Sequence, residues 1–284
     1  MILQFMKMSM IFDIDEIIDI IFNSGEIAKK YQSLKKVSYK LKKDKSKVSD
    51  ADVEINNYII NYLTKKFPQI KILSEEDNIV NQKKVIKDDT FFIIDPIDGT
   101  SSFIEKSDFF TINLTLIYKN SPKISIIYAP NIDLMLCAEL EKTYKVEIIN
   151  GVKRKEVIKN KNQINCNTRL KVLTTKRKSE IVDIESFLSK YRLEYDIQHI
   201  SSSIKFCYVA LNEADVYIRN ANIKLWDIVA GFHISKNAGL DVLNIKGENL
   251  YNIFLEKSYL NKISENNFKV DKFIISNHNL KWVL

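Results

Sequence analysis

The chain has 284 residues, of which 45% are hydrophobic, and a formal net charge of +7. This length and apolar content indicate an ordinary globular protein with one large domain or two smaller ones. The lysines are scattered among Ile, Asn and Tyr rather than gathered into one arm, which argues against a dedicated nucleic-acid-binding protein.

The cysteine pattern and the lack of a recognisable targeting signal favour a cytoplasmic protein. Cys137, Cys166 and Cys207 lie far apart, match no metal-ligand spacing and leave an odd number for disulfides. The apolar N-terminus contains Lys7 and has no small-residue cleavage pattern, so it is no convincing signal peptide. No apolar run reaches the ~18 residues that a bilayer span needs. The sequence leaves open a peripheral association with the inner face of the cytoplasmic membrane, and a monomer or a homodimer.

Two amphipathic helices are predicted near the N-terminus. Apolar residues recur at helical spacing over Asp13 to Tyr31, which is entered through acidic residues. A second helix follows Ser49, and Pro68 lies just past its end. Its predicted apolar face consists of Val53, Ile55, Ile59, Tyr62, Leu63 and Phe67.

The basic run Lys35 to Lys47 between these helices is the one dense positive patch. It is open to three interpretations, in decreasing order of preference: a solvated loop, a rim that attracts phosphate, and a weak nucleic-acid contact.

Two predicted strands end in carboxylates. Ile70 to Leu73 leads into the acidic triplet Glu75, Glu76 and Asp77. Phe91 to Ile94 is β-branched and aromatic, and Pro96 and Gly99 are expected to stop it as Asp95 and Asp98 form a tight turn.

Two carboxylates held ~4 Å apart repel by about 4 kcal/mol at an effective dielectric constant of ~20. The pair Asp95 and Asp98 therefore requires a proton or a cation, and hard oxygen ligands of this kind suit Mg²⁺. The alternative is an ordinary solvated turn, since Asp-Pro and Asp-Gly pairs are common turn formers.

The remaining patterns divide the chain into two halves. Strands at Thr111 to Tyr118, Lys123 to Tyr128 and Asp133 to Glu139 predict an antiparallel meander, so that residues 1–160 form helices packed on an antiparallel sheet. The polar segment Asn160 to Asn167 is expected to link this half to residues 161–284.

The second half alternates strands and helices, which favours an α/β layer. Its predicted elements are the strand Leu170 to Thr174, the helices Glu180 to Tyr191 and Ile204 to Leu211, the strand Ala214 to Arg219 and the helix Trp226 to Ala238, which Gly239 ends. Asp227, at the start of the last helix, is either a cap or part of a close-packed site beside the small residues Ala230 and Gly231.

Three motifs together resemble the signature elements of the inositol monophosphatase superfamily of Mg²⁺-dependent, lithium-sensitive phosphatases. They are ILSEED at Ile72 to Asp77, IDPIDGT at Ile94 to Thr100 and WDIVAG at Trp226 to Gly231, and they match in order and spacing. The resemblance implies an α+β and α/β fold, the layered αβαβα sandwich of that superfamily.

Further stretches resemble the CysQ-type 3'(2'),5'-bisphosphate nucleotidases within the superfamily. They are KKDKSKVSDAD at Lys42 to Asp52, FTINLTLI at Phe110 to Ile117, IIYAP at Ile126 to Pro130 and SSSIKFCYVA at Ser201 to Ala210. Inositol monophosphatases carry an acid seven residues before the WD aspartate, whereas this chain has Asn220 there, with Arg219 before it as in the nucleotidases.

The resemblance implies a role for each acidic residue. Two or three Mg²⁺ ions per active site would be bound by Glu75, Asp95, the backbone carbonyl of Ile97, Asp98 and Asp227. Thr100, hydrogen-bonded to Asp52, would orient the attacking water and help to deprotonate it, with Glu75 as part of the catalytic set. Glu76 would support the ligands from outside the metal site.

The resemblance also implies the substrate contacts. Phosphate would rest near the amides of Gly99 and Thr100, beside Asp227. Ser202, Ser203 and Lys205 would face a second phosphate or the sugar, and Arg219 would clamp a phosphate. The alternative for the serines is a helix cap, and for Lys205 an exposed position.

The sequence thus predicts a phosphomonoesterase that removes the 3'-phosphate of adenosine 3',5'-bisphosphate, a small phosphorylated nucleotide; no nucleic-acid partner is expected. One alternative is an inositol monophosphatase or a fructose-bisphosphatase-like enzyme. Another is a non-catalytic protein that binds a phosphorylated ligand or RNA through Lys35 to Lys47. Ser201, Ser101, Ser102 and Ala221 depart from the nucleotidase pattern, which concerns nucleotide preference rather than the metal ligands. His199, His233 and His278 show no ligand pairing and are expected to be structural or exposed.

Overall fold

The computed structural model describes residues 12–42, 44–159, 169–175, 178–189, 194–252 and 256–277. For residues 178–182 and 277 it describes the backbone alone. The described part of the chain therefore does not include residues 1–11, the expected linker Asn160 to Asn167 with Cys166, or His278.

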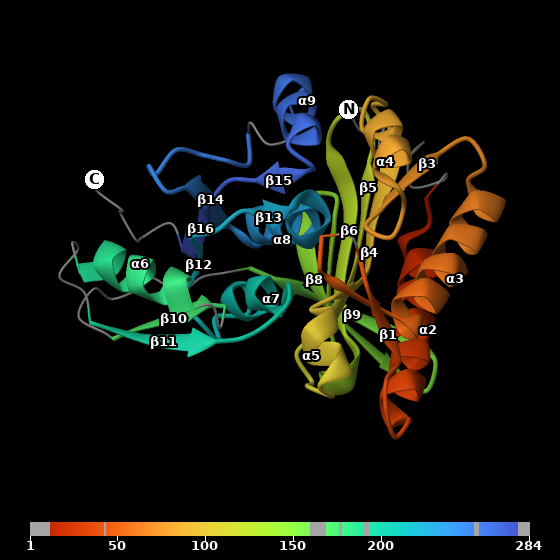
Figure 1. The fold of residues 1–284 in the computed structure, drawn as a ribbon, viewed down its shortest axis with the longest axis horizontal. Coiled ribbons are helices and arrows are strands. Elements are labelled where there is room, and N and C mark those ends of the chain that lie inside the picture. Colours follow the sequence, from red (N-terminus) through yellow and green to blue (C-terminus); the bar gives the residue numbers. More distant parts are fainter. Residues whose placement is uncertain are drawn as a thin grey trace.

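Two sheets form the framework of the molecule (Figure 1). The larger has seven strands in the order β3 (Lys71–Ser74), β4 (Phe91–Asp98), β5 (Thr111–Ile117), β6 (Pro122–Ala129), β7 (Leu134–Glu139), β8 (Lys142–Ile149) and β9 (Val152–Ile158). The smaller has five in the order β11 (Tyr195–His199), β10 (Leu170–Thr174), β12 (Val216–Arg219), β16 (Phe273–Asn277) and β14 (Leu240–Asn244). In the larger sheet β3 and β4 are parallel and the other neighbours antiparallel.

Helices and sheets alternate in five layers. Helices α2 (Ile14–Ser33) and α3 (Asp50–Lys66) cover one face of the larger sheet, and α7 (Ile204–Ala210) and α8 (Leu225–Ala238) lie between the two sheets. Helix α6 (Lys178–Ser189) covers the outer face of the smaller sheet, as Figure 1 shows. The predicted αβαβα sandwich is therefore confirmed.

Short elements lie around these layers. They are the hairpin β1 (Tyr39–Leu41) and β2 (Lys47–Ser49), the ribbon β13 (Ile223–Lys224) and β15 (Lys269–Val270), the helices α4 (Ile79–Val85), α5 (Thr100–Ile104) and α9 (Lys257–Glu265), and the 3-10 turn η1 (Pro130–Ile132).

Helix α8 is buried on nearly all sides because it packs on both sheets. A helix in such a position must be apolar all round, and its sequence LWDIVAGFHISKNA is largely so. Gly231 lets α7 approach closely, because a Cβ there would lie 2.2 Å from the ring of Phe206. Gly239, with φ +91, ends the helix as predicted.

The predicted helices and strands occur near their expected positions, with two corrections. Strand β4 continues past Pro96 to Asp98, with an irregular register against β5 between Asp95 and Asp98, so Asp95 lies within a strand rather than in a turn. Val53 was wrongly placed on the apolar face of its helix, since it is 48% exposed. The face of this helix that packs on the sheet is formed by its buried residues, among them Ile55 and Ile59.

The larger sheet is built from residues 71–158 and the smaller from residues 170–277. Helix α8 packs against both. The division of the chain into domains at residue 160 stays a prediction.

Candidate active site

Three acidic side chains from distant parts of the chain meet at one end of the larger sheet. Glu75, Asp95 and Asp227 each offer a carboxylate oxygen, and these atoms all lie within 4.8 Å of one another. Glu75 follows β3 and Asp95 lies in the adjacent parallel strand β4, where the Glu75 N–H donates to the Ile94 carbonyl at 3.2 Å. Asp227 comes from the first turn of α8, which packs on the same sheet.

Asp95 carries the strongest indication of a cation. It is 1% exposed, and neither carboxylate oxygen has a hydrogen-bond partner among the residues that the structure describes. Burial, together with the charges of Glu75, Asp98 and Asp227, raises its pKa well above the usual value. A buried ionised carboxylate without a partner is costly, and a divalent cation bound by these oxygens removes that cost. The donor set fits Mg²⁺, which prefers hard oxygen ligands.

Asp227 and Asp98 are also carboxyl groups whose pKa values are raised by burial. Burial and the neighbouring charges of Asp98 and Glu75 raise the pKa of Asp227 well above its ordinary value. Burial also raises the pKa of Asp98, although a hydrogen bond from Ser203 opposes the shift. The backbone N–H of Lys224 donates to Asp227 Oδ2 at 3.3 Å, so Asp227 also caps α8, as one of its two interpretations expected.

Ser203 connects two of these acidic residues. Its hydroxyl lies 2.5 Å from Asp98 Oδ2 and 2.6 Å from the backbone carbonyl oxygen of Asp227. Asn113, which is paired with Asp95 across β4 and β5, donates to Ser203 Oγ at 3.0 Å. Although Ser203 precedes α7, its side chain makes no capping hydrogen bond, so a helix cap is not its role.

Lys42 contacts the site from the β1–β2 hairpin. Its Nζ donates to Glu75 Oε1 at 2.9 Å and to Glu76 Oε1 at 2.7 Å. Burial raises the pKa of Glu76 to about 7, and repulsion from Glu75 adds to this shift while Lys42 opposes it. Lys42 therefore fixes the positions of two carboxylates that would otherwise repel each other.

The expected hydrogen bond between Thr100 and Asp52 is present. Thr100 Oγ1 lies 3.2 Å from Asp52 Oδ1 and 3.1 Å from the Ile97 carbonyl oxygen. Asp52 is held at its other oxygen by the N–H and hydroxyl of Ser49, in a capping box at the start of α3. Burial raises the pKa of Asp52 to about 6.

A pocket of about 740 Å³ opens onto this cluster. Its lining includes the predicted site residues Glu75, Ile97, Asp98, Gly99, Thr100, Ser202, Ser203, Lys205, Arg219 and Asp227. It also includes Asp44, Lys45, Lys47, Lys224 and Lys269. Lys45 and Lys47 place part of the basic run Lys35 to Lys47 at the rim of the pocket.

Lys205 and Arg219 line the pocket but are almost entirely buried, at 2% and 5% exposure. The alternative that Lys205 is merely exposed is therefore wrong. Lys205 Nζ donates to the backbone carbonyl oxygens of Ile200 at 3.0 Å and Ser202 at 2.5 Å. The Asn220 side chain is directed elsewhere, because it donates to Asp183 Oδ2 at 2.8 Å.

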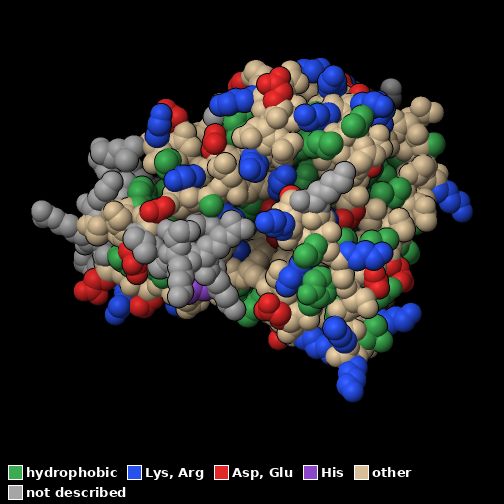
Figure 2. Space-filling view, viewed as in Figure 1, with side chains coloured by type: hydrophobic (Ala, Val, Ile, Leu, Met, Phe, Trp, Pro, Cys, Tyr) green, Lys and Arg blue, Asp and Glu red, His purple; other side chains and the backbone are tan. Residues whose placement is uncertain are grey.

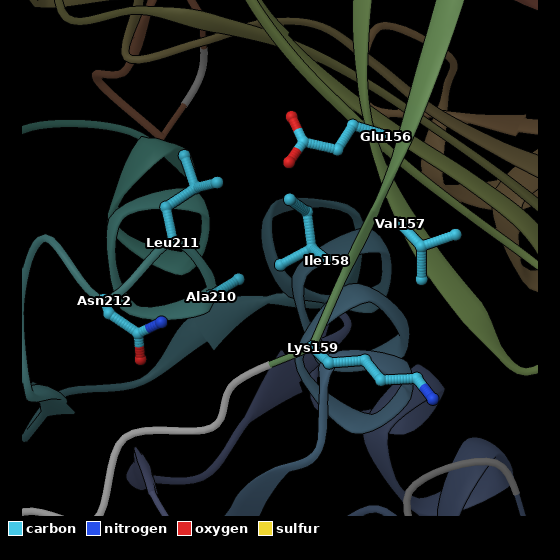
Figure 3. Close-up of a pocket in the computed structure, with 7 residues that line it drawn as sticks. All are labelled: Glu156, Val157, Ile158, Lys159, Ala210, Leu211 and Asn212. Carbon is cyan, nitrogen blue, oxygen red and sulfur yellow. The ribbon is translucent and has the colours of Figure 1, made fainter.

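A second pocket of about 520 Å³ lies apart from the acidic cluster, between the end of β9 and the end of α7 (Figure 3). In Figure 3 the side chains of Glu156 and Ile158 extend toward Leu211, whereas that of Val157 points away. No predicted site residue lines this pocket.

The surface and the buried residues outside the site bear on other expectations. Figure 2 shows basic side chains spread over one face and interspersed with acidic ones, in agreement with the scattered lysines.

Cys137 and Cys207 are buried free thiols. His233 is buried, as a structural role requires, and His199 is exposed. Among the described residues, no helix has both the length and the apolar character needed to cross a bilayer.

Four residues at the site were not predicted as such from the sequence: Lys42, Asn113, Lys224 and Lys269. Asn113 was detectable as a polar residue within a strongly apolar strand, and Lys42 as the first residue of the KKDKSKVSDAD stretch. No comparable local signal marks Lys269, because its position depends on pairing with a distant strand.

Known proteins resemble this chain along most of its length. The family model described as the inositol monophosphatase family matches residues 13–278. The 3'(2'),5'-bisphosphate nucleotidase CysQ of Buchnera aphidicola is 30% identical over 250 residues, which cover 87% of this chain and 91% of the relative. The CysQ of Salmonella typhimurium is 29% identical over 84% of this chain and 92% of its own.

Solved structures agree on the fold. The structure of CysQ from Bacteroides thetaiotaomicron aligns with a TM-score of 0.69 at 24% identity, and covers 92% of this chain and 95% of its own. A Thermotoga maritima IMPase aligns with a TM-score of 0.70 at 23% identity, and covers 94% and 92%. Since the family model spans nearly all of the described residues, the chain belongs to the inositol monophosphatase family.

Proposed function

We propose that this protein is a Mg²⁺-dependent phosphomonoesterase that removes the 3'-phosphate from adenosine 3',5'-bisphosphate and releases AMP and phosphate. The observation that carries the proposal is the meeting of the carboxylates of Glu75, Asp95 and Asp227, of which Glu75 and Asp227 line a pocket that several basic residues also line. The substrate is supported by the relatives named 3'(2'),5'-bisphosphate nucleotidase, two of which are 29–30% identical to this chain. Asn220 occupies the position where inositol monophosphatases carry an acid that holds inositol hydroxyls. Its side chain lies away from the pocket and donates to Asp183, so this position does not support an inositol substrate.

The proposed metal ligands are Glu75, Asp95, the carbonyl of Ile97, Asp98 and Asp227, which would hold two or three Mg²⁺ ions. When bound, such ions polarise the phosphate, lower the pKa of a water and neutralise the leaving oxygen. The chain supports these ligands through Lys42, which holds Glu75, and through Ser203, which holds Asp98. Glu76 shares Lys42 with Glu75, which fits a supporting position.

Thr100 and Asp52 are the proposed residues that handle the proton of the attacking water. Thr100 Oγ1 lies within hydrogen-bond reach of both Asp52 and the Ile97 carbonyl, so its hydroxyl has a fixed position at the pocket wall. A hydroxyl that donates to a carboxylate can accept a hydrogen bond from water and pass a proton toward that carboxylate. Asp52, in turn, is fixed by Ser49 and does not line the pocket.

The proposed phosphate-binding residues lie in the pocket near the acidic cluster. Gly99 has φ +89, and a Cβ there would lie 3.3 Å from Ser202 Cβ, so glycine leaves the backbone amides of Gly99 and Thr100 accessible to an anion. Ser202, Lys205 and Arg219 line the same pocket and are the proposed contacts to phosphate or sugar. The predicted contacts of Ser203 and Asp227 with substrate stay predictions.

The test is a comparison of phosphate release from adenosine 3',5'-bisphosphate and from inositol 1-phosphate in the presence of Mg²⁺. We expect steady turnover of the nucleotide that stops with EDTA and in Asp95→Asn. A preference for inositol 1-phosphate would defeat the substrate assignment. RNA binding without any turnover would disprove the proposal that the protein is an enzyme. A location in the cytoplasm, peripheral membrane association and a monomer or homodimer stay predictions.

A further inference from the structure

The larger sheet ends at an open edge. Strand β9 is last in its strand order, and in the part of the chain that the structure describes no strand pairs with its outer side. It is joined to β8 by a turn at Asn150 and Gly151, both of which have positive φ. In such a two-residue hairpin the residues next to the turn hydrogen-bond to each other, and the direction of the backbone groups then alternates along the strand. The backbone groups of Lys153, Lys155 and Val157 therefore point away from β8.

Apolar side chains are exposed along this edge. Val152 and Val157 of β9 are 61% and 43% exposed, and Ile149, which is paired with Val152, is 46% exposed. Unpaired backbone groups beside exposed apolar side chains form a template to which another strand can bind. The edge therefore has the features of an interaction surface.

The lysines that commonly protect an edge strand are neutralised within the chain. Lys153 forms an ion pair with Asp19 at 2.7 Å, and Lys155 forms one with Asp15. Both aspartates belong to α2, so these two side chains lie against that helix. Lysine on an edge strand opposes the approach of another strand through its charge. An aspartate already compensates each of these two charges.

The other face of β9 carries charges of both signs. Arg154 lies opposite Glu147 of β8, and Glu156 lies opposite Lys145. Lys145 and Glu147 form an ion pair with each other at 3.1 Å. Arg154 and Glu156 are exposed, and neither forms an ion pair with another described residue. Opposite charges thus alternate both along and across the two strands.

A second copy of β9 complements this charge pattern. When two β9 strands pair antiparallel about a two-fold axis at Lys155, Arg154 of each copy lies opposite Glu156 of the other. The charges then alternate across four strands, in the order Glu147, Arg154, the second copy's Glu156 and the second copy's Lys145. An axis at Arg154 or at Glu156 would instead place like charges opposite each other. The charges therefore specify both the occupant and the register.

The apolar residues agree with this register. Val152 lies opposite the second copy's Ile158, on the same face of the sheet as Arg154, because alternate residues of a strand share a face. Ile158 lines the pocket of about 520 Å³ at the end of β9, together with Leu211 (Figure 3). The hairpin of the second copy would thus bring its exposed Val152 to an existing groove.

We propose that the outer edge of β9 is a self-association surface, through which two copies of this chain pair about a two-fold axis and join their seven-stranded sheets. A two-fold dimer uses the same patch on both partners, as this self-complementary pattern requires. The mode of binding is the addition of a strand to an exposed sheet edge. The inference does not depend on the proposed function, because no residue of β9 lines the pocket beside the acidic cluster.

The main experiment measures the mass of the full-length protein by sedimentation equilibrium. We expect the wild type to dimerise. Glu156→Arg and Arg154→Glu should each raise the dimer dissociation constant at least about tenfold, because each places like charges opposite each other. An equimolar mixture of the two variants should associate again, since a strand with two arginines then meets a strand with two glutamates.

The matched controls are charge reversals at exposed positions of α9. Lys262→Glu and Glu265→Arg change the net charge as the two β9 variants do, and both should dimerise like the wild type. Circular dichroism confirms that each variant is folded.

A proline variant tests the backbone pairing. Lys155→Pro removes an N–H that points away from β8, so the hairpin keeps its own hydrogen bonds while the edge can no longer pair in full. This variant should be folded and monomeric.

Three results would overturn the surface. They are a wild type that stays monomeric at its highest soluble concentration, a dimer whose dissociation constant no β9 variant changes, and folded charge variants that fail to associate when mixed.

Discussion

Thr100 Oγ1 lies 3.2 Å from Asp52 Oδ1, although 48 residues separate the two in the chain. The contact joins the start of α3 to the residue that follows Gly99 at the end of β4, so it couples the cap of a helix to the wall of the pocket. A buried carboxylate next to a hydroxyl is the arrangement expected for proton transfer from a water.

Replacing Thr100 with valine should lower kcat by about 10²-fold or more, the usual contribution of a positioned proton acceptor. Valine keeps the size of the side chain but cannot bind Asp52 or the Ile97 carbonyl. Thr100→Ser retains the hydroxyl and should recover most of the activity. The measurement is steady-state phosphate release together with the melting temperature. Equal activity of the valine and serine variants would remove Thr100 from the mechanism.

Asp95→Asn should abolish turnover and the stabilisation by Mg²⁺, while it leaves the metal-free protein as stable as the wild type or more so. The reason is that the substitution removes a buried charge next to Glu75 and Asp227. The wild type should gain about 2.7 kcal/mol at a Mg²⁺ concentration of 100 times Kd.

Melting temperatures in EDTA and in Mg²⁺ test this prediction, with Glu265→Gln at an exposed position of α9 as the control. That control should melt like the wild type in both conditions. A variant Asp95→Asn that Mg²⁺ still stabilises fully would exclude Asp95 as a ligand.

Gly231→Ala should destabilise the fold by about 1–3 kcal/mol, the cost of overpacking a core. Its Cβ would lie 2.2 Å from the fully buried ring of Phe206, which is packed against the rings of Tyr217, Phe232 and Phe273. Activity should fall as well, because α8 carries Asp227. Urea unfolding gives the free energy.

Gly151→Ala provides a comparison at the turn between β8 and β9. A Cβ there meets nothing within 4 Å, but φ is +76, so about 1–2 kcal/mol of backbone strain is expected and no loss of activity. If both variants retained full activity, the packing of α7 on α8 would not be what positions the site.

His233 should make stability depend on pH. Its ring contacts Ser125 Oγ at 2.9 Å and the Asn237 side chain at 3.1 Å, and burial, with a smaller effect from Lys123, lowers its pKa to about 3. Between pH 6.5 and about 3 the unfolded chain binds a proton that the folded chain does not. The stability contributed by the neutral ring is therefore complete above pH 6.5 and is lost as the pH falls, by at most about 1.4 kcal/mol per unit.

The measurement is the free energy of unfolding of the wild type and of His233→Gln between pH 7 and pH 4. The difference between the two should shrink as the pH falls, because the variant lacks the titrating ring. His199→Gln, at an exposed position, serves as the control. A difference that stays constant over this range would contradict the prediction.

The sequence by itself predicted the acidic residues of the candidate site and the class of the fold. Strands that lead into Glu75 and Asp95, and a helix that begins beside Asp227, are visible locally because apolar runs and carboxylates are adjacent in the chain. Repulsion between carboxylates that are held close together calls for a proton or a cation, whatever the fold. The alternation of sheet and helix signals predicted helices on an antiparallel sheet followed by an α/β layer, and the resemblance of the three motifs to a known family implied the layered sandwich.

Only the tertiary structure decided which of these residues meet and what surrounds them. It placed Asp95 inside a strand and buried Lys205. It also brought Lys42 onto Glu75, and set Lys224 opposite Lys269. The physical reason is that local patterns specify which face of an element is buried but not which distant strand or helix covers it. Burial, pairing and the field at a charged group depend on that packing.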